Sequence, residues 1–199
     1  MNVLVLAKTH VGGAYCVGGL NASNQSLRLY EANGSFPPAN TAYQVGQIWE
    51  MTVTPSPTPR PPHVEDVAVT SARYVEQQPN LAQDLLQRIV PWTGGIQGLF
   101  GGHLGFTGRR RGYVEAPNVP ARSTWFWTPD RDLQHANIDG KGYYRYAGYE
   151  MSYVGVDPPV QMLPAGTLVR VSLARWWKPP DAGPGFPERC YLQLSGWYV

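Results

Sequence analysis

Residues 2–30, NVLVLAKTHVGGAYCVGGLNASNQSLRLY, decide the fold. Three segments in this stretch have the apolar or alternating pattern of short β-strands: 2–6, 14–20 and 27–30. They are separated by Gly12-Gly13 and by the run 21–24 (Asn-Ala-Ser-Asn), which are residues that favour tight turns. The stretch therefore predicts three successive strands and a β-rich fold.

Two further strands are predicted downstream, over 46–54 and 63–69. Between them lies the run 55–62, PSPTPRPP, and proline cannot donate to a sheet ladder. We interpret this run as a stiff polyproline loop outside the sheet. Five short strands within about 75 residues are typical of a small barrel of the OB or SH3-like kind.

One helix is predicted, over 81–90. Asn80 can cap it, Leu81, Leu85 and Ile89 line one face, and Pro91 ends it. The following segment 98–112 is rich in glycine and contains an arginine triplet, so we expect a mobile loop there.

Strand patterns return in the second half, over 123–127, 143–156, 167–173 and 189–198. They predict a second five-stranded barrel with longer loops, without a residue-level repeat of the first. The expected organisation is a first OB-like barrel over 1–78, a connecting helix and linker over 79–97, and a second OB-like barrel over 98–199. The predicted fold class is therefore mainly all-β, two tandem OB-like barrels joined by a short helix, with less than about a fifth of residues helical.

Composition supports a folded, turn-rich protein. The 199 residues include 22 Gly and 19 Pro, yet 43% are hydrophobic and 12% are aromatic, which disordered chains lack. No apolar run approaches the roughly 18 residues that span a bilayer, and no basic region precedes the strand-length apolar start. We expect a cytoplasmic protein without a membrane span. Cys16 and Cys190 are too few for a disulfide framework or a four-cysteine zinc site, and we predict no metal and no cofactor.

Charge and aromatic residues are unevenly distributed along the chain. Residues 1–100 hold five basic and six acidic residues, whereas residues 101–199 hold eleven and eight. Thirteen of the sixteen cations are arginine, and sixteen of the aromatic residues lie in the second half against eight in the first. This pattern is that of a nucleic-acid groove, where arginine and aromatic rings contact backbone and bases. The same pattern would arise if Trp and Tyr fill a small β core and arginine covers its rim.

The candidate nucleic-acid or ligand contacts lie mostly in the second half. These are Arg109, Arg110, Arg111, Arg122, Trp125, Trp127, Arg145, Arg175, Trp176 and Trp177. The arginine triplet is read either as a set of phosphate contacts or as a solvated charge run. Of Trp176 and Trp177, strand alternation predicts that one lies in the core and the other is exposed.

Three candidates lie in the first half. Arg28 is central to a short strand and is expected to be held by a carboxylate, Glu65 first, or to face a ligand groove. His63 and Glu65 share one strand face and could contact a base edge or Arg28.

Patterns that indicate catalysis are absent. There is no phosphate loop followed by a helix, no nucleophile elbow, and no zinc-protease or deaminase motif. A pairing of His10 with Cys16 is conceivable, but cysteine in a strand is more often a small buried apolar residue. We predict no catalytic residue.

Several segments are similar to those of one family, the dual OB-containing domain, a bacterial module named for two consecutive OB folds. They are 4–9 with 13–19, 26–29, 62–67, RVSLARWW at 170–177 and CYLQLSGWY at 190–198. One departure is the stretch 7–10, Ala-Lys-Thr-His, where the family usually has Asn-Ser-Arg-Lys. The resemblance implies a binding module for nucleic acid or nucleotides, associated with bacterial conflict or mobile systems, and brings no established catalytic residues.

The residues and the resemblance together predict a tandem OB module that binds single-stranded nucleic acid or a nucleotide-like ligand. The alternative is a protein-interaction module that docks a partner enzyme through the polyproline loop and exposed aromatic rings. Salt dependence separates the two, because counterion release makes nucleic-acid binding weaken steeply with salt.

Overall fold

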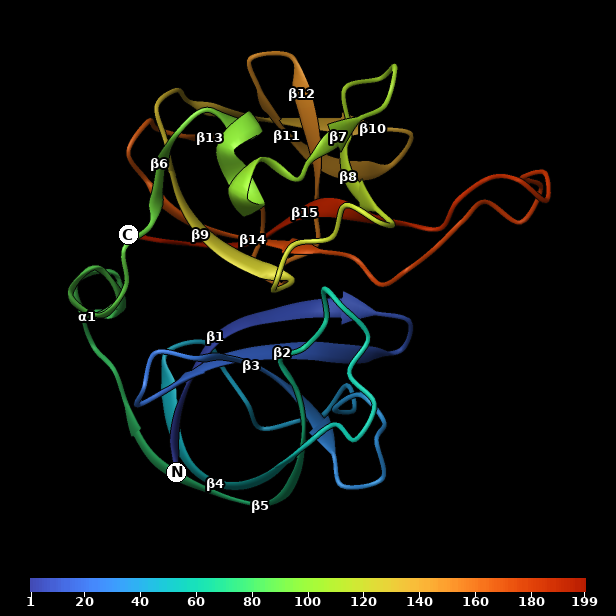
Figure 1. Cartoon of the computed structure of the whole chain (residues 1–199). Helices are drawn as coiled ribbons and strands as arrows, with labels where there is room; N and C mark the ends of the chain where they lie inside the picture. Colours follow the sequence, from blue (N-terminus) through green and yellow to red (C-terminus); the bar gives the residue numbers. More distant parts are fainter.

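The computed structural model describes residues 1–199, of which 51% lie in strands and 8% in helices. The predicted fold class is confirmed, with one closed five-stranded barrel and a second large sheet. Figure 1 shows the barrel below the sheet, with the single α-helix at one side of the boundary. No helix is long and apolar enough to cross a membrane.

The first unit is a barrel of five strands: β1 (Asn2–Val11), β2 (Ala14–Asn21), β3 (Ser26–Glu31), β4 (Gln47–Pro55) and β5 (Asp66–Gln77). They are paired in the closed order β1-β2-β3-β5-β4. β3 and β5 are parallel, and the other neighbours are antiparallel. This is the partly parallel Greek-key order of an OB barrel.

The second unit contains the remaining strands and a short 3₁₀ helix. They are β6 (Trp92–Gly94), η1 (Ile96–Gly102), β7 (Gly105–Phe106), β8 (Gly112–Glu115), β9 (Thr124–Pro129), β10 (Leu133–Ile138), β11 (Lys141–Tyr146), β12 (Tyr149–Tyr153), β13 (Met162–Leu163), β14 (Leu168–Leu173) and β15 (Arg189–Tyr198). The main sheet runs in the order β13-β10-β11-β12-β15-β14-β9-β6.

The two units share one topology when β9 and β10 are taken as a single strand bent at residues 130–132. β9 then pairs with β14 and β10 with β11, just as β1 pairs with β4 at its start and with β2 beyond it. β12 and β15 form the parallel pair that corresponds to β3 and β5. The second unit is thus an OB-like barrel whose first strand is broken by a turn.

The apolar run at the start of the chain is buried on both faces of β1. Val3 and Val5 lie in the core of the first barrel, whereas Leu4 and Leu6 lie in a cluster with residues of the second unit. Phe126, Leu168 and Tyr198 supply that side of the cluster, and the hydroxyl of Tyr198 donates to the carbonyl of Leu6 at 2.9 Å. β1 therefore belongs to two cores, and the units are packed against each other along it.

The helix α1 (Leu81–Arg88) packs Leu85 into the same cluster. The predicted cap was wrong, because the side chain of Asn80 makes no capping hydrogen bond. The helix is anchored at its other end, where Arg88 donates to the carbonyl of Asn21 at 2.7 Å and to Asn24 Oδ1 at 3.0 Å.

The expectation of a loop over 98–112 was wrong for residues 98–106, most of which belong to η1 and β7, while residues 107–111 do form a loop. Leu99 and Phe100 of η1 are buried in the core of the second unit. Phe100, Gly101 and Gly102 have left-handed backbone angles, with φ of 53°, 68° and 80°. Glycine adopts this region without steric cost, so the glycines let the chain turn sharply and return two apolar side chains to the core.

Because the inter-unit cluster joins both units, we predict that they unfold together. Leu6→Ala, which removes a fully buried side chain, should lower the free energy of unfolding by about 2–5 kcal/mol. Leu86→Ala, on the exposed face of α1, should change it by less than about 0.5 kcal/mol. Thermal unfolding followed by near-ultraviolet circular dichroism should show one transition that shifts as a whole in Leu6→Ala. Two separated transitions, with only one shifted, would contradict the prediction.

Candidate ligand-binding clefts between and beside the units

Alternation along β14 places a charged residue between the units. Val169, Val171 and Leu173 lie in the core of the second unit. The intervening residues, Leu168, Arg170 and Ser172, are also buried and therefore face the other way, toward the first barrel. The alternation of β14 therefore places Arg170 at the boundary between the units.

Arg170 is only 5% exposed, and most N–H groups of its guanidinium group have no hydrogen-bond partner. Its Nη1 donates to Ser195 Oγ at 3.0 Å, which is the only hydrogen bond of the guanidinium group, and no carboxylate forms an ion pair with it. Gly18 makes room for the group, since a Cβ there would lie 2.6 Å from Nη2. Burial lowers the pKa of Arg170, yet arginine in a protein stays charged.

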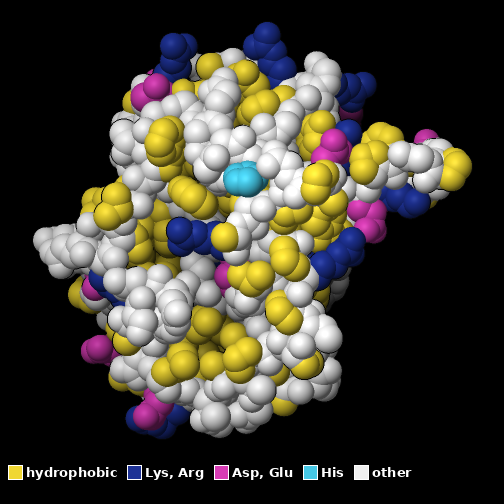
Figure 2. Space-filling model, in the orientation of Figure 1, with side chains coloured by type: hydrophobic (Ala, Val, Ile, Leu, Met, Phe, Trp, Pro, Cys, Tyr) yellow, Lys and Arg dark blue, Asp and Glu magenta, His cyan; other side chains and the backbone are white.

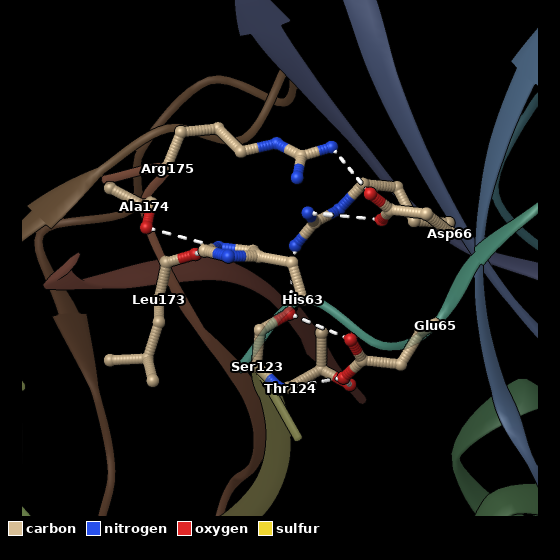
Figure 3. Close-up of polar contacts among 9 residues, drawn as sticks. His63, Glu65, Asp66, Ser123, Thr124, Leu173, Ala174 and Arg175 are labelled. Carbon is tan, nitrogen blue, oxygen red and sulfur yellow. Dashed lines mark hydrogen bonds and ion pairs between the residues drawn. The ribbon is translucent and has the colours of Figure 1, made fainter. Parts of the chain in front are cut away.

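A polar network, which we call the interface network, joins the units beside this residue: Arg28, His63, Glu65, Asp66, Ser123, Thr124 and Arg175 (Figure 3). Arg28 donates to Asp66 at 3.3 Å and to Ser123 Oγ at 2.8 Å. Ser123 in turn donates its backbone N–H and its hydroxyl to the Glu65 carboxylate, at 2.6 and 3.0 Å. A serine from the second unit therefore bridges a buried cation and a buried anion of the first.

The predicted partner of Arg28 was wrong. The carboxylate that pairs with it belongs to Asp66, while Glu65 reaches Arg28 only through Ser123. The reason is register, because Arg28 and Asp66 are directly opposite in the parallel β3–β5 pair. Asp66 also accepts from Arg175 at 2.7 Å, so one carboxylate holds two guanidinium groups.

His63 joins the end of the polyproline loop to the second unit. Its Nε2 lies 3.2 Å from the carbonyl oxygen of Leu173 and 3.1 Å from that of Ala174. Since both neighbours only accept, Nε2 carries the proton, and the buried Nδ1 has no partner. Burial, reinforced by the charge of Arg28, lowers the pKa of His63 to about 4, so the ring is neutral at pH 7.

The inter-unit cleft is a cavity of about 340 Å³ next to the network. Its polar lining comes from both units: Thr9, His10, Cys16, Arg28, Thr124, Arg170, Ser172, Arg175 and Gln193, with Trp176 and Trp177 among the aromatic residues. Three guanidinium groups and no carboxylate line it. In Figure 2, basic side chains lie among apolar ones at the boundary between the units.

A second cavity, of about 460 Å³, lies on the second unit and is called the barrel-face pocket here. It is formed by side chains of β11, β12 and β15 together with the loops 107–111 and 174–188. Its lining includes Arg109, Arg111, Tyr143, Tyr191 and Trp177. Trp177 is 50% exposed and lines both the cleft and the pocket.

The ligand contacts predicted in the second half of the chain lie in different places. Arg175, Trp176 and Trp177 line the inter-unit cleft, and Arg109 and Arg111 line the barrel-face pocket. The others lie outside both cavities. Arg122 stacks on Trp125 at 4.8 Å, Arg145 pairs with Glu150 at 3.2 Å, and Arg110 lies over Tyr149 at 5.6 Å.

Trp127 is a core residue. It is fully buried and donates its Nε1–H to the carbonyl of Gly94 at 2.8 Å, so its prediction as a ligand contact was wrong. β14 ends at Leu173 and does not continue through Trp176 and Trp177, yet the two rings differ as the alternation predicted: Trp176 packs against the core of the second unit, whereas Trp177 is 50% exposed. Trp176 is half-buried, with Arg60 above its ring, and donates to the carbonyl of Pro61 at 2.9 Å.

The arginine triplet does not act as one unit. Arg111 pairs with Glu150 at 3.4 Å and lies over Tyr143 at 4.6 Å, whereas Arg109 makes no ion pair or hydrogen bond. Sequence reasoning missed Arg170, Ser123 and Asp66. The alternation of 168–173 did carry a signal for Arg170, since it placed that residue opposite Val169 and Val171.

Comparison with known proteins gives one match. A family model described as a dual OB-containing domain matches residues 1–197. No curated protein and no solved structure matches the chain.

Ser123→Ala tests the network. It removes the hydroxyl that accepts from Arg28 Nη2 and donates to Glu65 Oε2. One buried N–H and one buried carboxylate oxygen then lose their hydrogen bond, so the free energy of unfolding should fall by about 1–3 kcal/mol. Ser71→Ala, on the exposed part of β5, is the matched control and should change it by less than about 0.5 kcal/mol. Denaturant unfolding of the three proteins measures both, and equal midpoints would contradict the role given to Ser123.

A second prediction concerns pH. Burial raises the pKa of Asp66 from 3.8 to about 6, and the opposing charge of Arg28 does not cancel this. The native state then binds a proton that the unfolded chain has released, so this contribution to stability is present below about pH 4 and is lost as pH rises through about 6. The stability of the wild type relative to Asp66→Asn should therefore fall between about pH 4 and 7. A difference that rises over this range, as for a carboxylate stabilised mainly by its ion pairs, would contradict the prediction.

Proposed function

The chain belongs to the dual OB-containing domain family, and we propose that it binds single-stranded nucleic acid or a nucleotide-like ligand. OB barrels bind such ligands on the face of their second and third strands and between two loops, by stacking and an electrostatic groove. The proposal includes a role in a bacterial conflict or mobile system, which rests on the family resemblance alone. The division into functional units at 1–78, 79–97 and 98–199 is part of the same proposal.

The second unit is the better candidate for ligand binding. In the first barrel, the loop between β4 and β5 is docked on the second unit by His63 and Glu65. The corresponding loop of the second unit, 174–188 between β14 and β15, projects from the body of the molecule (Figure 1). Its exposed residues leave it accessible to a ligand.

The exposed ring of Trp177 is the observation that carries the proposal. It lines both the inter-unit cleft and the barrel-face pocket, 6.0 Å from the ring of Tyr191. Arg109, which makes no ion pair, lines the pocket, and Arg175 lines the cleft. An exposed aromatic ring that shares a cavity with cations is the arrangement that binds unpaired bases and their phosphates.

The protein-docking alternative has less support. It requires the polyproline loop to be free, but Arg60 pairs with Glu188 at 2.6 Å and Pro61 accepts from Trp176. The loop is therefore held against the second unit.

Fluorescence anisotropy with an oligothymidylate of about ten nucleotides tests the proposal. Trp177→Ala should weaken binding by about 1–3 kcal/mol because it removes a stacking platform. Trp92→Ala, which removes an exposed tryptophan of β6, is the matched control and should bind like the wild type. Equal loss in both variants, or none in either, would contradict the assignment of the platform.

The salt dependence of the same binding tests the charge. Arg109→Ala should reduce the slope of log affinity against log salt by about one unit, since one phosphate contact is lost. Arg73→Ala, an exposed arginine of the first barrel paired with Glu50, should leave the slope unchanged. A wild-type affinity that does not respond to salt would favour the protein-docking alternative instead.

A further inference from the structure

We propose that the inter-unit cleft binds a phosphomonoester group, with Arg170 as its innermost ligand. The inference rests on the proposed function and narrows it, because it assigns one end of the ligand to a specific chemical group. It is carried by three features of the cleft: an unpaired buried cation, an uneven charge balance, and a recessed position.

The unpaired cation is Arg170. A buried charge without a partner is costly, and proteins normally pair it with an opposite charge. Here one hydrogen bond, to Ser195, is all that the guanidinium group makes, and the rest of its N–H groups are free toward the cleft that it lines. A planar set of free N–H donors matches the oxygens of a phosphate, which arginine binds in a two-pronged fashion.

The charge balance of the boundary favours an anion. Arg28, Arg170 and Arg175 line the cleft, whereas the carboxylates of the network, Glu65 and Asp66, do not. Both carboxylates are already engaged, Glu65 by Ser123 and Asp66 by two arginines. One positive charge is left over beside a cavity of about 340 Å³, which is the size of a small-ligand site.

The buried position of Arg170 favours a phosphate at the end of a ligand over one within a strand. Exposure rises from 5% at Arg170 to 50% at Trp177, so the arginine lies at the inner end of the cleft and the tryptophan at the outer end. A phosphodiester within a strand would have to bring a nucleotide on each side into this recess. A phosphomonoester at the end of a molecule needs no such room, and it carries nearly two negative charges at pH 7 against one for a diester.

Two arginines of the cleft are already held in place by hydrogen bonds before a ligand binds. Arg28 is fixed by Asp66 and Ser123, and Arg175 is fixed by Asp66, so neither guanidinium group has to be ordered when the phosphate arrives. Such preorganisation lowers the entropic cost of binding. The hydroxyl of Ser172, which also lines the cleft, adds a hydrogen-bond donor, whereas that of Thr9 donates to the carbonyl of Cys16 at 3.4 Å.

Isothermal titration calorimetry with matched probes tests the inference. The probes are an oligothymidylate with and without a 5′-phosphate, thymidine 5′-monophosphate, thymidine, and inorganic phosphate as a competitor. In the wild-type protein, the terminal phosphate should tighten binding of the strand or of the nucleoside by at least about tenfold, which is the effect of charge-assisted hydrogen bonds to arginine. The strand pair and the nucleoside pair distinguish a strand end from a free nucleotide as the source of the group.

Two variants test the residues. Arg170→Gln and Arg175→Gln should each reduce the advantage of the phosphorylated probe to less than about threefold, whereas Arg122→Gln, an exposed arginine outside the cleft, should retain it. Arg175 is half-exposed, so its variant keeps the inference falsifiable if Arg170→Gln does not fold. Excess inorganic phosphate should lower the affinity of the phosphorylated probe to that of the unphosphorylated one.

Equal affinities for phosphorylated and unphosphorylated probes in the wild type would overturn the inference. If the strand then still binds with dependence on Trp177, the proposed function stands without it. If thymidine 5′-monophosphate binds through Arg170 and Arg175 but no strand binds, the inference stands and strand binding fails.

Discussion

Buried charged groups of the first barrel lie where it meets the second unit. Glu65 and Asp66 come from the first barrel, and their hydrogen bonds are completed by Ser123 and Arg175 of the second. Neither unit alone satisfies these groups, and a buried unpaired charge is among the most costly features a fold can carry. The relative placement of the two units depends on this requirement, together with the apolar cluster around β1. At the same boundary Arg170 has no counter-charge, and it lines the inter-unit cleft.

Much of the fold could be predicted from local patterns. The apolar run 2–6 predicted a buried strand, and the structure adds that both its faces are buried, one in each core. The parity of 167–173 separated the core residues Val169 and Val171 from Arg170. What could not be predicted depends on contacts distant in sequence. The bend between β9 and β10 contains no glycine that would have indicated a turn. The burial of Leu99 and Phe100 depends on a core that only the assembled sheet provides.

The site was only partly predictable for the same reason. Arg28 was expected to be held by a carboxylate, and it is, but the choice of Asp66 over Glu65 follows from the parallel register of β3 and β5. Trp127 is a residue type that is common in binding grooves, yet its position on β9 directs its side chain into the core. Composition thus indicated which kinds of residue are available for binding, and the pairing of strands decided which of them reach a surface. Arg175 and Trp177 remain candidates because β14 ends before them and releases them toward the cleft.

Hydrogen–deuterium exchange with and without a 5′-phosphorylated oligothymidylate tests the central claim, that one ligand is held across both units. The account predicts that binding slows exchange at the same time in residues 7–18 of the first unit and residues 170–177 of the second, because both line the inter-unit cleft. Slower exchange confined to β11, β12 and β15, with residues 7–18 unchanged, would contradict it.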